Sequence, residues 1–300
     1  MLPGSVASSP LVFLEPQLAT LRDKVPPADR WVYEIKFDGY RMQLHVVGGK
    51  PTLYTRSGLN WTPKFASIAA AAVGLPVNDA ILDGEVVVQD AKGRSRFSDL
   101  QADISNGRFD RMQFFAFDLL YLDGFDIRAA PLLERKRVLA GLLENVKGPL
   151  QYSEHFETDG NALFKQACKI GLEGIIAKVK NAAYRSGRME SWLKIKCIMC
   201  GTYTVVGFLP HPGAVGALYL ARKEGKDLVY VGKAGTGFTR QVAADLRRLL
   251  DPLVVPKPQL SKPMRKKDAV WVKPSVKAEI EYRDITNDGY LRHVSYKKLI

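Results

Sequence analysis

The residues best suited to chemistry stand early in the chain, where the sequence reads Lys36-x-Asp-Gly-x-Arg41 between strand-like flanks. A lysine amine attacks as a nucleophile only when it is neutral, and nearby cations lower its pKa because they disfavour another positive charge. Lys194 and Lys196, far along the chain, are the cations that we expect beside Lys36. Taken alone, the pattern around Lys36 is more typical of a charged strand that enters a turn. A catalytic role for Lys36 therefore depends on further charged residues elsewhere in the chain.

Five further charged clusters follow Lys36 in order. They are Thr55-Arg56-Ser57-Gly58, Leu82-Asp83-Gly84-Glu85, Phe115-Ala116-Phe117-Asp118, Glu173 to Lys178, and Trp192-Leu193-Lys194-Ile195-Lys196. Alternate side chains of a strand point to the same face, so Lys194 and Lys196 would present both amines together. Phosphoryl and nucleotidyl transfer depend on positioning and charge neutralisation, and these clusters supply both cations and carboxylates.

Strands and helices alternate in the first two thirds of the chain. Segments rich in Val, Ile, Phe and Tyr predict strands at Leu53 to Thr55, Ala80 to Gln89, Met112 to Leu122 and Gly174 to Val179. Helical patterns lie at Phe65 to Val73, Leu132 to Glu144 and Gly160 to Ile170. This mixture predicts an α+β domain over residues 1–198.

From residue 199 to residue 300 the pattern changes to short strands separated by Gly and Pro turns. Strands are expected at Tyr203 to Phe208, Val215 to Arg222, Leu228 to Val231, Val270 to Val272 and Ala278 to Tyr282. One helix is expected at Thr239 to Leu250, and Pro252 to Lys267 is expected to form a surface loop. The second domain is therefore predicted to be a small β-barrel of the OB-fold type.

The chain is basic, with a formal net charge of +13 and a pI near 9.6. Residues 199–300 hold 18 Lys and Arg against 9 Asp and Glu, so most of the excess lies in the last third. A basic surface favours a polyanionic partner, because each neutralised phosphate releases condensed counterions. The run Arg265-Lys266-Lys267 is typical of solvated loop charges, with a clamp for the phosphates of a duplex as the alternative.

Three cysteines, Cys168, Cys197 and Cys200, are too few for a disulfide framework, and an unpaired thiol suits a reducing compartment. The lone C-x-x-C at Cys197 and Cys200 lacks a second pair, so ordinary packing is expected rather than a zinc or redox site. The sequence contains neither a signal-peptide pattern nor an apolar run long enough for a membrane span. These features predict a cytoplasmic protein without a membrane partner.

The set of clusters resembles the nucleotidyltransferase motifs of the covalent ligase and mRNA-capping superfamily, most closely the ligase module of bacterial ligase D. The runs Phe117 to Gly124, Glu173 to Lys178, Tyr230 to Phe238 and Asp288 to His293 carry this resemblance. It extends from about residue 10 to the end of the chain. It implies an ATP-grasp-like adenylation domain followed by an OB-fold domain, and an ATP-dependent DNA ligase that seals breaks between a 5′-phosphate and a 3′-hydroxyl.

By this resemblance Lys36 attacks the α-phosphorus of ATP, expels pyrophosphate and holds AMP as a phosphoramidate. AMP then passes to the 5′-phosphate of DNA, and the 3′-hydroxyl displaces it. Lys194 and Lys196 would hold the α-phosphate. Glu85 and Glu173 would hold Mg²⁺ or Mn²⁺, hard cations that prefer oxygen ligands, and Glu85 would also contact the ribose or the reacting groups. The implied cofactors are therefore ATP, carried as covalent AMP, and a divalent metal.

Five further residues receive nucleotide-binding roles from the same resemblance. Phe117 would stack on the adenine, and Glu34 would lie near the base. Arg41 would contact the ribose or the reacting groups. Arg56 would meet the ribose or, later, the 5′-phosphate of the DNA. Arg292 belongs to the last motif, which orients the leaving pyrophosphate.

Two aspartates are expected to have a structural role, and the C-terminal motif differs from the usual family pattern. Asp38 and Asp83 each precede a glycine, so we expect them to brace turns. Members of the family commonly have a proline and a glycine in the last motif where this chain has Val294 and Lys298. Arg292 and the lysines that follow it would then have to orient the pyrophosphate.

The resemblance also implies biological partners. These are nicked or broken duplex DNA, with Ku and a repair polymerase as companions in bacterial end joining at the nucleoid, and a monomeric chain. The alternatives are an RNA ligase, a GTP-dependent capping enzyme, and a non-catalytic DNA-binding protein that keeps a relic nucleotide pocket. An NAD⁺-dependent ligase is disfavoured, because the sequence has no four-cysteine zinc module.

Overall fold

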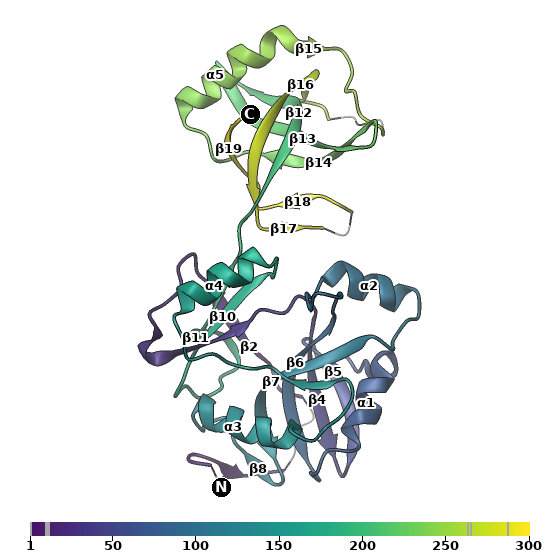
Figure 1. Ribbon diagram of the computed structural model, residues 1–300, viewed down its shortest axis with the longest axis vertical. Coiled ribbons are helices and arrows are strands. Elements are labelled where there is room, and N and C mark those ends of the chain that lie inside the picture. Colours follow the sequence, from purple (N-terminus) through teal and green to yellow (C-terminus); the bar gives the residue numbers. More distant parts are fainter. Residues whose placement is uncertain (1, 10–12, 263, 265, 287) are drawn as a thin grey trace. The chain divides into compact units, whose positions relative to one another are not determined.

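A computed structural model describes residues 2–9, 13–262, 264, 266–286 and 288–300. The chain forms two compact units, Met1–Cys197 and Ile198–Ile300 (Figure 1). Each unit has its own apolar core.

A seven-stranded sheet forms the centre of the first unit. Its order is β1-β8-β7-β6-β4-β5, with β9 beside β7. The strands are β1 (Val6–Ala7), β4 (Tyr40–Val47), β5 (Lys50–Thr55), β6 (Ala80–Val88), β7 (Met112–Leu122), β8 (Phe125–Asp126) and β9 (Leu150–Tyr152). The helices that accompany it are α1 (Ala66–Ala72), α2 (Phe97–Ser105) and α3 (Leu132–Leu143), with the 3-10 turn η2 (Thr62–Phe65) before α1. Helix α3 packs on β7, and fully buried residues such as Leu82, Phe114 and Leu139 fill the space between sheet and helices.

The second sheet of this unit has the order β2-β11-β10-β3. Its strands are β2 (Gln17–Leu21), β3 (Trp31–Ile35), β10 (Gly174–Val179) and β11 (Gly187–Lys196). The 3-10 turn η1 (Ala28–Arg30) precedes β3, and α4 (Gly160–Lys169) precedes β10. Asp159 caps α4, because its side chain accepts a hydrogen bond from the Asn161 amide at 2.9 Å. The antiparallel pairing of β3 with β10 brings Lys36, which follows β3, close to Gly174.

Within the first unit, each segment predicted to be a strand or a helix adopts that structure. Asp83 was expected in a turn, and this prediction is wrong because Asp83 is fully buried in the middle of β6. The following glycine is required by packing instead: a Cβ at Gly84 would come within 2.4 Å of the Phe114 ring. Asp38 does accept a hydrogen bond, at 3.0 Å from the Phe97 amide, and so links the turn after β3 to the start of α2.

The second unit is a strongly bent sheet with one helix (Figure 1). Its order is β14-β13-β12-β16-β15, with β19 beside β16 and a separate hairpin of β17 and β18. The elements are β12 (Met199–His211), β13 (Ala214–Glu224), β14 (Asp227–Ala234), α5 (Arg240–Leu250), η3 (Asp251–Leu253), β15 (Val254–Val255), β16 (Val270–Tyr282), β17 (Asp284–Ile285), β18 (Leu291–Arg292) and β19 (Ser295–Leu299). Thr239 caps α5 through the Val242 amide, and Leu246 and Leu250 of that helix are buried in the core.

Two predictions for the second unit differ from the structure in extent. The segments Val270 to Val272 and Ala278 to Tyr282 form one strand, β16, although Pro274 lies between them. The pairing of β16 with β12 skips from Trp271 to Val276, so the proline does not need to donate to that ladder. The expected surface loop from Pro252 contains the short strand β15, which pairs with β16. Arg265 of the basic run lies outside the described residues.

The cysteines do not simply pack. Cys168 on α4 and Cys197 at the end of β11 form a disulfide, which corrects the expectation of unpaired thiols. The sequence conceals this pairing because 29 positions separate the two residues. Cys200 is free and exposed. In the part of the chain that the structure describes, no helix has the length and apolarity needed to cross a bilayer.

Candidate active site

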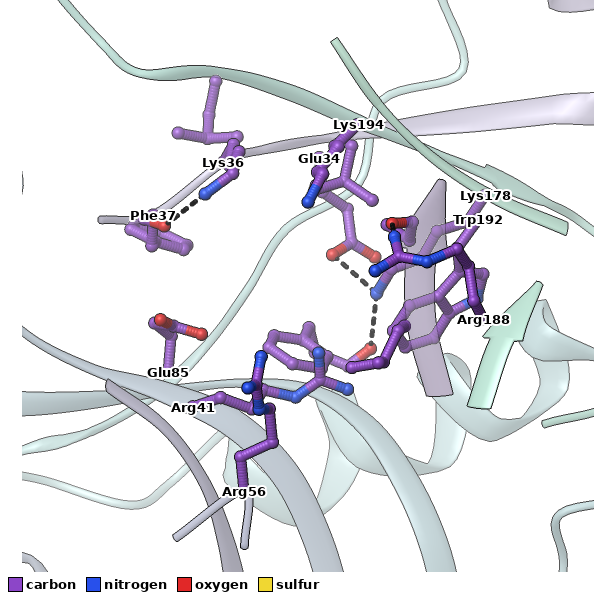
Figure 2. Close-up of a pocket in the computed structure, with 15 residues that line it drawn as sticks. Glu34, Lys36, Phe37, Arg41, Arg56, Glu85, Lys178, Arg188, Trp192 and Lys194 are labelled. Carbon is purple, nitrogen blue, oxygen red and sulfur yellow. Dashed lines mark hydrogen bonds and ion pairs between the residues drawn. The ribbon is translucent and has the colours of Figure 1, made fainter. Parts of the chain in front are cut away.

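A pocket in the first unit draws its walls from both sheets (Figure 2). The larger sheet contributes Arg41 from β4, Glu85 from β6 and Phe117 from β7. The smaller sheet contributes Lys178 from β10 and Lys194 from β11. The other lining residues are Leu18, Ala19, Glu34, Ile35, Lys36, Phe37, Arg56, Ile176, Arg188 and Trp192. Most of the charged residues singled out in the sequence thus converge on one cavity.

Lys36 lies just beyond the end of β3, where its amide donates to the Gly174 carbonyl at 3.0 Å. Its Nζ donates to a carboxylate oxygen of Glu173 and points towards the Phe37 carbonyl, 3.4 Å away. Burial pushes the pKa of Lys36 down, but the nearby carboxylates of Glu173 and Glu85 outweigh burial and leave the pKa raised. The expected lowering by neighbouring cations is therefore wrong for this arrangement, because carboxylates lie closest to the amine.

Glu173 joins two lysines. Its second carboxylate oxygen lies 2.6 Å from Nζ of Lys196, so Glu173 bridges Lys36 and Lys196. Burial raises the pKa of Glu173, yet the two lysines overcome that effect and hold the pKa below its usual range. Lys194 faces the pocket from the same strand as Lys196, and its pKa is lowered by burial, by Lys36 and by Arg188.

Glu85 is the second carboxylate of the pocket. It lies opposite Arg41 in the pairing of β4 with β6. Burial raises its pKa to about 7, with Lys36 and Arg41 acting in the opposite direction. At neutral pH the carboxyl of Glu85 is therefore divided between its protonated and ionised forms.

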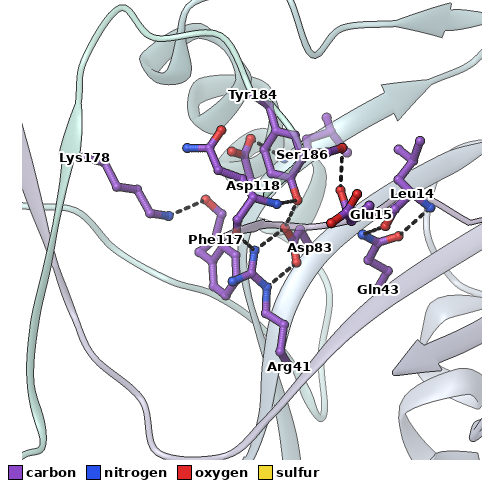
Figure 3. A network of polar contacts seen from close by, with 12 residues as sticks. Leu14, Glu15, Arg41, Gln43, Asp83, Phe117, Asp118, Lys178, Tyr184 and Ser186 are labelled. Carbon is purple, nitrogen blue, oxygen red and sulfur yellow. Dashed lines mark hydrogen bonds and ion pairs between the residues drawn. The ribbon is translucent and has the colours of Figure 1, made fainter. Parts of the chain in front are cut away.

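Arg41 is held by a buried network (Figure 3). Its Nε and Nη2 each donate to a carboxylate oxygen of Asp83 at 2.6 Å, and the Tyr184 hydroxyl donates to Asp83 at 2.7 Å. The guanidinium also lies over the Phe117 ring, 4.5 Å from its centroid. Burial lowers the pKa of Arg41, but Asp83 more than compensates and raises it. Arg41 is thus a fixed, permanently charged part of the pocket wall.

Glu34 is buried and contacts two lysines, of which Lys178 is drawn in Figure 2. Its carboxylate oxygens lie 2.8 Å from Nζ of Lys136 and 2.8 Å from Nζ of Lys178. Lys178 also lies 4.4 Å from the centroid of Phe117, and burial lowers its pKa to about 8. The position expected for the adenine base is therefore bordered by a rigid cluster of one carboxylate and two ammonium groups.

The structure brings most of the predicted site residues together. Seven of them line the pocket: Glu34, Lys36, Arg41, Arg56, Glu85, Phe117 and Lys194. Glu173 and Lys196 are connected to it through Lys36. Arg292 lies on β18 of the second unit and is exposed there. Its predicted role toward pyrophosphate remains a prediction.

Sequence reasoning gave no role to Lys136, Lys178, Arg188 or Trp192. Lys178 and Trp192 lay inside recognised clusters, so a signal was available for both. Lys136 sits among Leu132 and Leu139 at the spacing of a buried helical face, where a lysine is unusual enough to indicate a buried partner. Arg188 had no local signal, because its position in the pocket depends on how β11 pairs with β2.

Comparison with known proteins gives a consistent result. The family model described as "ATP dependent DNA ligase domain" matches residues 16–196, and that described as "ATP dependent DNA ligase C terminal region" matches residues 211–299. The chain is 37% identical to the multifunctional non-homologous end joining protein LigD of Pseudomonas aeruginosa over 297 residues, covering 96% of this chain and 35% of that protein. With LigD of Mycobacterium tuberculosis it shares 33% identity over 280 residues, covering 91% and 36%.

Solved structures agree with these matches. The ligase domain of M. tuberculosis LigD has a TM-score of 0.58 at 32% identity, covering 96% of this chain and 95% of that one. A mycobacterial DNA ligase D complexed with ATP and MES has a TM-score of 0.57 at 32% identity, with the same coverage. The predicted class, an α+β adenylation domain followed by an OB-fold-like domain, is confirmed. The chain spans about a third of the length of the LigD relatives. It belongs to the ATP-dependent DNA ligase family.

Proposed function

We propose that this chain carries AMP on Lys36 and uses it to seal DNA breaks between a 5′-phosphate and a 3′-hydroxyl. The observation that carries the proposal is the position of the Lys36 amine in a cavity that also holds Glu34, Phe117 and Lys194. That cavity offers an aromatic ring for a base, cations for phosphates and a primary amine for covalent attachment.

The amine of Lys36 must lose a proton before it can attack. Burial and the charge on Lys194 favour the neutral amine, whereas Glu173 favours the ammonium form. Any interaction that draws Glu173 away from Lys36 would therefore release the amine for reaction. Glu173 acts, in this proposal, as the group that keeps Lys36 protonated until the nucleotide is in place.

A divalent metal, Mg²⁺ or Mn²⁺, fits the residues that are present. Glu85 and Glu173 both approach Lys36, and Mg²⁺ is usually bound through one or two carboxylates together with phosphate oxygens. Within the described residues no group of three or more acidic, histidine or cysteine side chains is gathered, so phosphate oxygens would be needed to complete the coordination. When bound, the metal would neutralise charge on the transferring phosphate.

The other predicted site residues receive roles that their contacts support. Lys194 and Lys196 are assigned to the α-phosphate. Phe117 and Glu34 are assigned to the adenine, since both lie beside Lys178 in the inner part of the pocket. Arg41, fixed by Asp83, and the exposed Arg56 are assigned to the ribose or to the 5′-phosphate of the DNA. Arg292, in the second unit, is assigned to the leaving pyrophosphate.

Nicked or broken duplex DNA is the proposed substrate. The names of the LigD relatives point to non-homologous end joining, and on that basis we propose bacterial end joining as the setting, in the cytoplasm at the nucleoid. Ku and a repair polymerase are the proposed companions, and the chain is proposed to act as a monomer.

Mass spectrometry after incubation with ATP and Mg²⁺ tests the proposal. We expect a single AMP adduct on Lys36, and sealing of a nicked duplex that carries a 5′-phosphate. Lys36→Ala and Lys36→Arg should both lose the adduct and the sealing, because neither residue offers a primary amine at that position. An adduct at another residue, or label retained from GTP alone, would refute the assignment.

A further inference from the structure

Lys136 is a fully buried cation to which the proposed function gives no role. It lies on α3 between the buried residues Leu132 and Leu139, and its side chain does not line the pocket. Burying an ammonium group is costly unless its partners compensate for the water that it loses. The partners of this ammonium group therefore indicate what it does.

Three acceptors surround the ammonium group of Lys136. Its Nζ lies 2.8 Å from Oε1 of Glu34 and donates to the carbonyls of Ser153 at 2.9 Å and Phe117 at 3.4 Å. An ammonium group has three donors, so these acceptors match its full capacity. Glu34 lies on β3 of the smaller sheet, and Phe117 lies on β7 of the larger sheet. One buried cation thus connects the two walls of the pocket.

The carboxylate of Glu34 depends on Lys136 for its orientation. Its Oε1 is buried and, among the residues that the structure describes, receives no well-aligned hydrogen bond, so the charge of Lys136 is what offsets the burial of this oxygen. The other oxygen, Oε2, lies 2.8 Å from Nζ of Lys178, which lines the pocket (Figure 2). Without Lys136, we expect the carboxylate to turn towards Lys178 and to lose its fixed direction.

A fixed carboxylate beside an aromatic ring can discriminate between purine bases. Glu34 and Phe117 both line the pocket, and a carboxylate accepts hydrogen bonds but donates none. The 6-amino group of adenine is a donor, whereas the 6-oxo group of guanine is an acceptor that a carboxylate repels. A site built to bind a donor rejects an analogue that lacks it, because the acceptor of the site is then left unpaired. This selection is lost if the carboxylate is free to turn away.

We propose that Lys136 is a positioning residue that sets the base specificity of the pocket. It acts through the carboxylate of Glu34 and the carbonyl of Phe117, and it does not touch the nucleotide. The inference rests on the proposed ligase function, in which Glu34 and Phe117 bind the adenine. The substrate class that this arrangement favours is a nucleoside triphosphate whose purine carries a hydrogen-bond donor at position 6.

Formation of the Lys36 adduct on the full chain tests this role with two nucleotides. One is ATP, and the other is purine riboside 5′-triphosphate, which lacks the 6-amino group. Each is supplied with Mg²⁺ over a range of concentrations, which gives the maximal rate and KM. The specificity ratio is kcat/KM for ATP divided by kcat/KM for the analogue. Because both values come from one preparation, the ratio does not depend on the fraction of a variant that is folded.

We expect the wild-type protein to prefer ATP by about 10- to 100-fold, in the range of a hydrogen bond to a charged group. Lys136→Met removes the charge and keeps a side chain of similar length. It should bring the specificity ratio close to one, mainly by raising KM for ATP. Lys136→Arg keeps a cation and should restore part of the ratio. If Lys136→Met gives no folded protein, Lys136→Gln takes its place with the same expected loss.

Two controls separate positioning from a purely structural role. Glu34→Ala should also bring the specificity ratio close to one, and adding Lys136→Met to it should change the ratio no further, because Lys136 acts through Glu34. Leu139 is fully buried on the same helix and packs in the apolar core. Leu139→Ala should therefore destabilise α3 but keep the wild-type ratio.

Three outcomes would overturn the role of Lys136. These are a wild-type ratio in Lys136→Met, an equal fall in Leu139→Ala, or a further fall when Lys136→Met is added to Glu34→Ala. The proposed function is checked separately by the adduct that ATP forms on Lys36 in the wild-type protein. If that adduct forms while the ratio is independent of Lys136, this inference fails and the ligase assignment stands. If neither nucleotide forms an adduct, the proposed function fails and the inference fails with it.

Discussion

The first unit buries charged side chains, whereas the second carries its charge on the surface. In the described part of the chain, all buried polar and charged residues except Thr204 belong to the first unit. Several of them form ion pairs in which both partners are buried, such as Arg135 with Asp118 and Lys178 with Glu34. In the second unit, ion pairs such as Lys297 with Glu281 leave much of both side chains exposed.

Buried and exposed charges have different electrostatic roles. Burying a charge is costly unless it is paired, so buried pairs fix side chains in one arrangement around the pocket. Exposed charges are mobile and screened by salt, and they act at longer range on any polyanion. The excess of 18 basic over 9 acidic residues in residues 199–300 belongs to this second kind. The comparison suggests that chemistry is positioned by the first unit and attraction to DNA is supplied largely by the second.

The largest effect is expected from breaking a buried pair. Asp83→Asn removes the carboxylate that two nitrogens of Arg41 contact, and it leaves a largely buried guanidinium without its partner. We expect the first unit to lose about 3 kcal/mol of stability. The matched change in the second unit, Glu281→Gln, removes the partner of the exposed Lys297 and should cost much less stability, because water screens this pair.

Hydrogen exchange followed by mass spectrometry reports the opening free energy of each unit separately, which suits a protein with two compact units. Equal losses for the two variants would contradict the contrast between buried and exposed pairs. The same would follow if Asp83→Asn left the protection of β4 and β6 unchanged.

The sequence reveals interactions between residues that are close along the chain, but not those between distant residues. Lys36 and its turn were predictable because Lys-x-Asp-Gly-x-Arg is a local pattern. Strand β7 was predictable because its residues are rich in Phe, Leu and Tyr. The ion-pair partners of the buried charged residues could not be predicted from the sequence. Lys136 reaches Glu34 from a distant helix, and the disulfide joins Cys168 to Cys197 across 29 positions. Such pairings follow from the packing of whole elements, which local spacing does not encode.

A medium effect is expected from titrating Glu85. Its pKa of about 7 means that about one carboxyl in ten is ionised at pH 6 and about nine in ten at pH 8. Metal binding needs the ionised form, so the affinity for Mn²⁺ alone should rise up to about tenfold between these pH values. Glu173 and Lys36 do not titrate in this window, because the pKa of Glu173 is lowered and that of Lys36 is raised.

Binding of Mn²⁺ to the full chain, measured by electron paramagnetic resonance without nucleotide, checks this dependence. Glu85→Gln should bind more weakly and show a nearly flat profile over the same range. A rise in affinity that persists unchanged in Glu85→Gln would assign the titration to another group. It would also remove the argument that Glu85 contributes to the metal site.

The smallest effect is expected from thinning the surface charge of the second unit. Lys266 and Lys267 are exposed residues of the basic run, and neither has an ion-pair partner among the described residues. Lys266→Gln with Lys267→Gln should weaken binding to nicked duplex a few-fold and reduce the slope of log K against log salt by about 1 to 2. Formation of the Lys36 adduct should be unaffected, because adenylylation of the lysine does not require DNA.

The control is an exposed lysine of the first unit, Lys147. Lys147→Gln should leave the slope of log K against log salt unchanged. If Lys147→Gln lowered the slope as much per charge as the double variant, attraction to DNA would be spread over both units, and the division of electrostatic work between them would not hold.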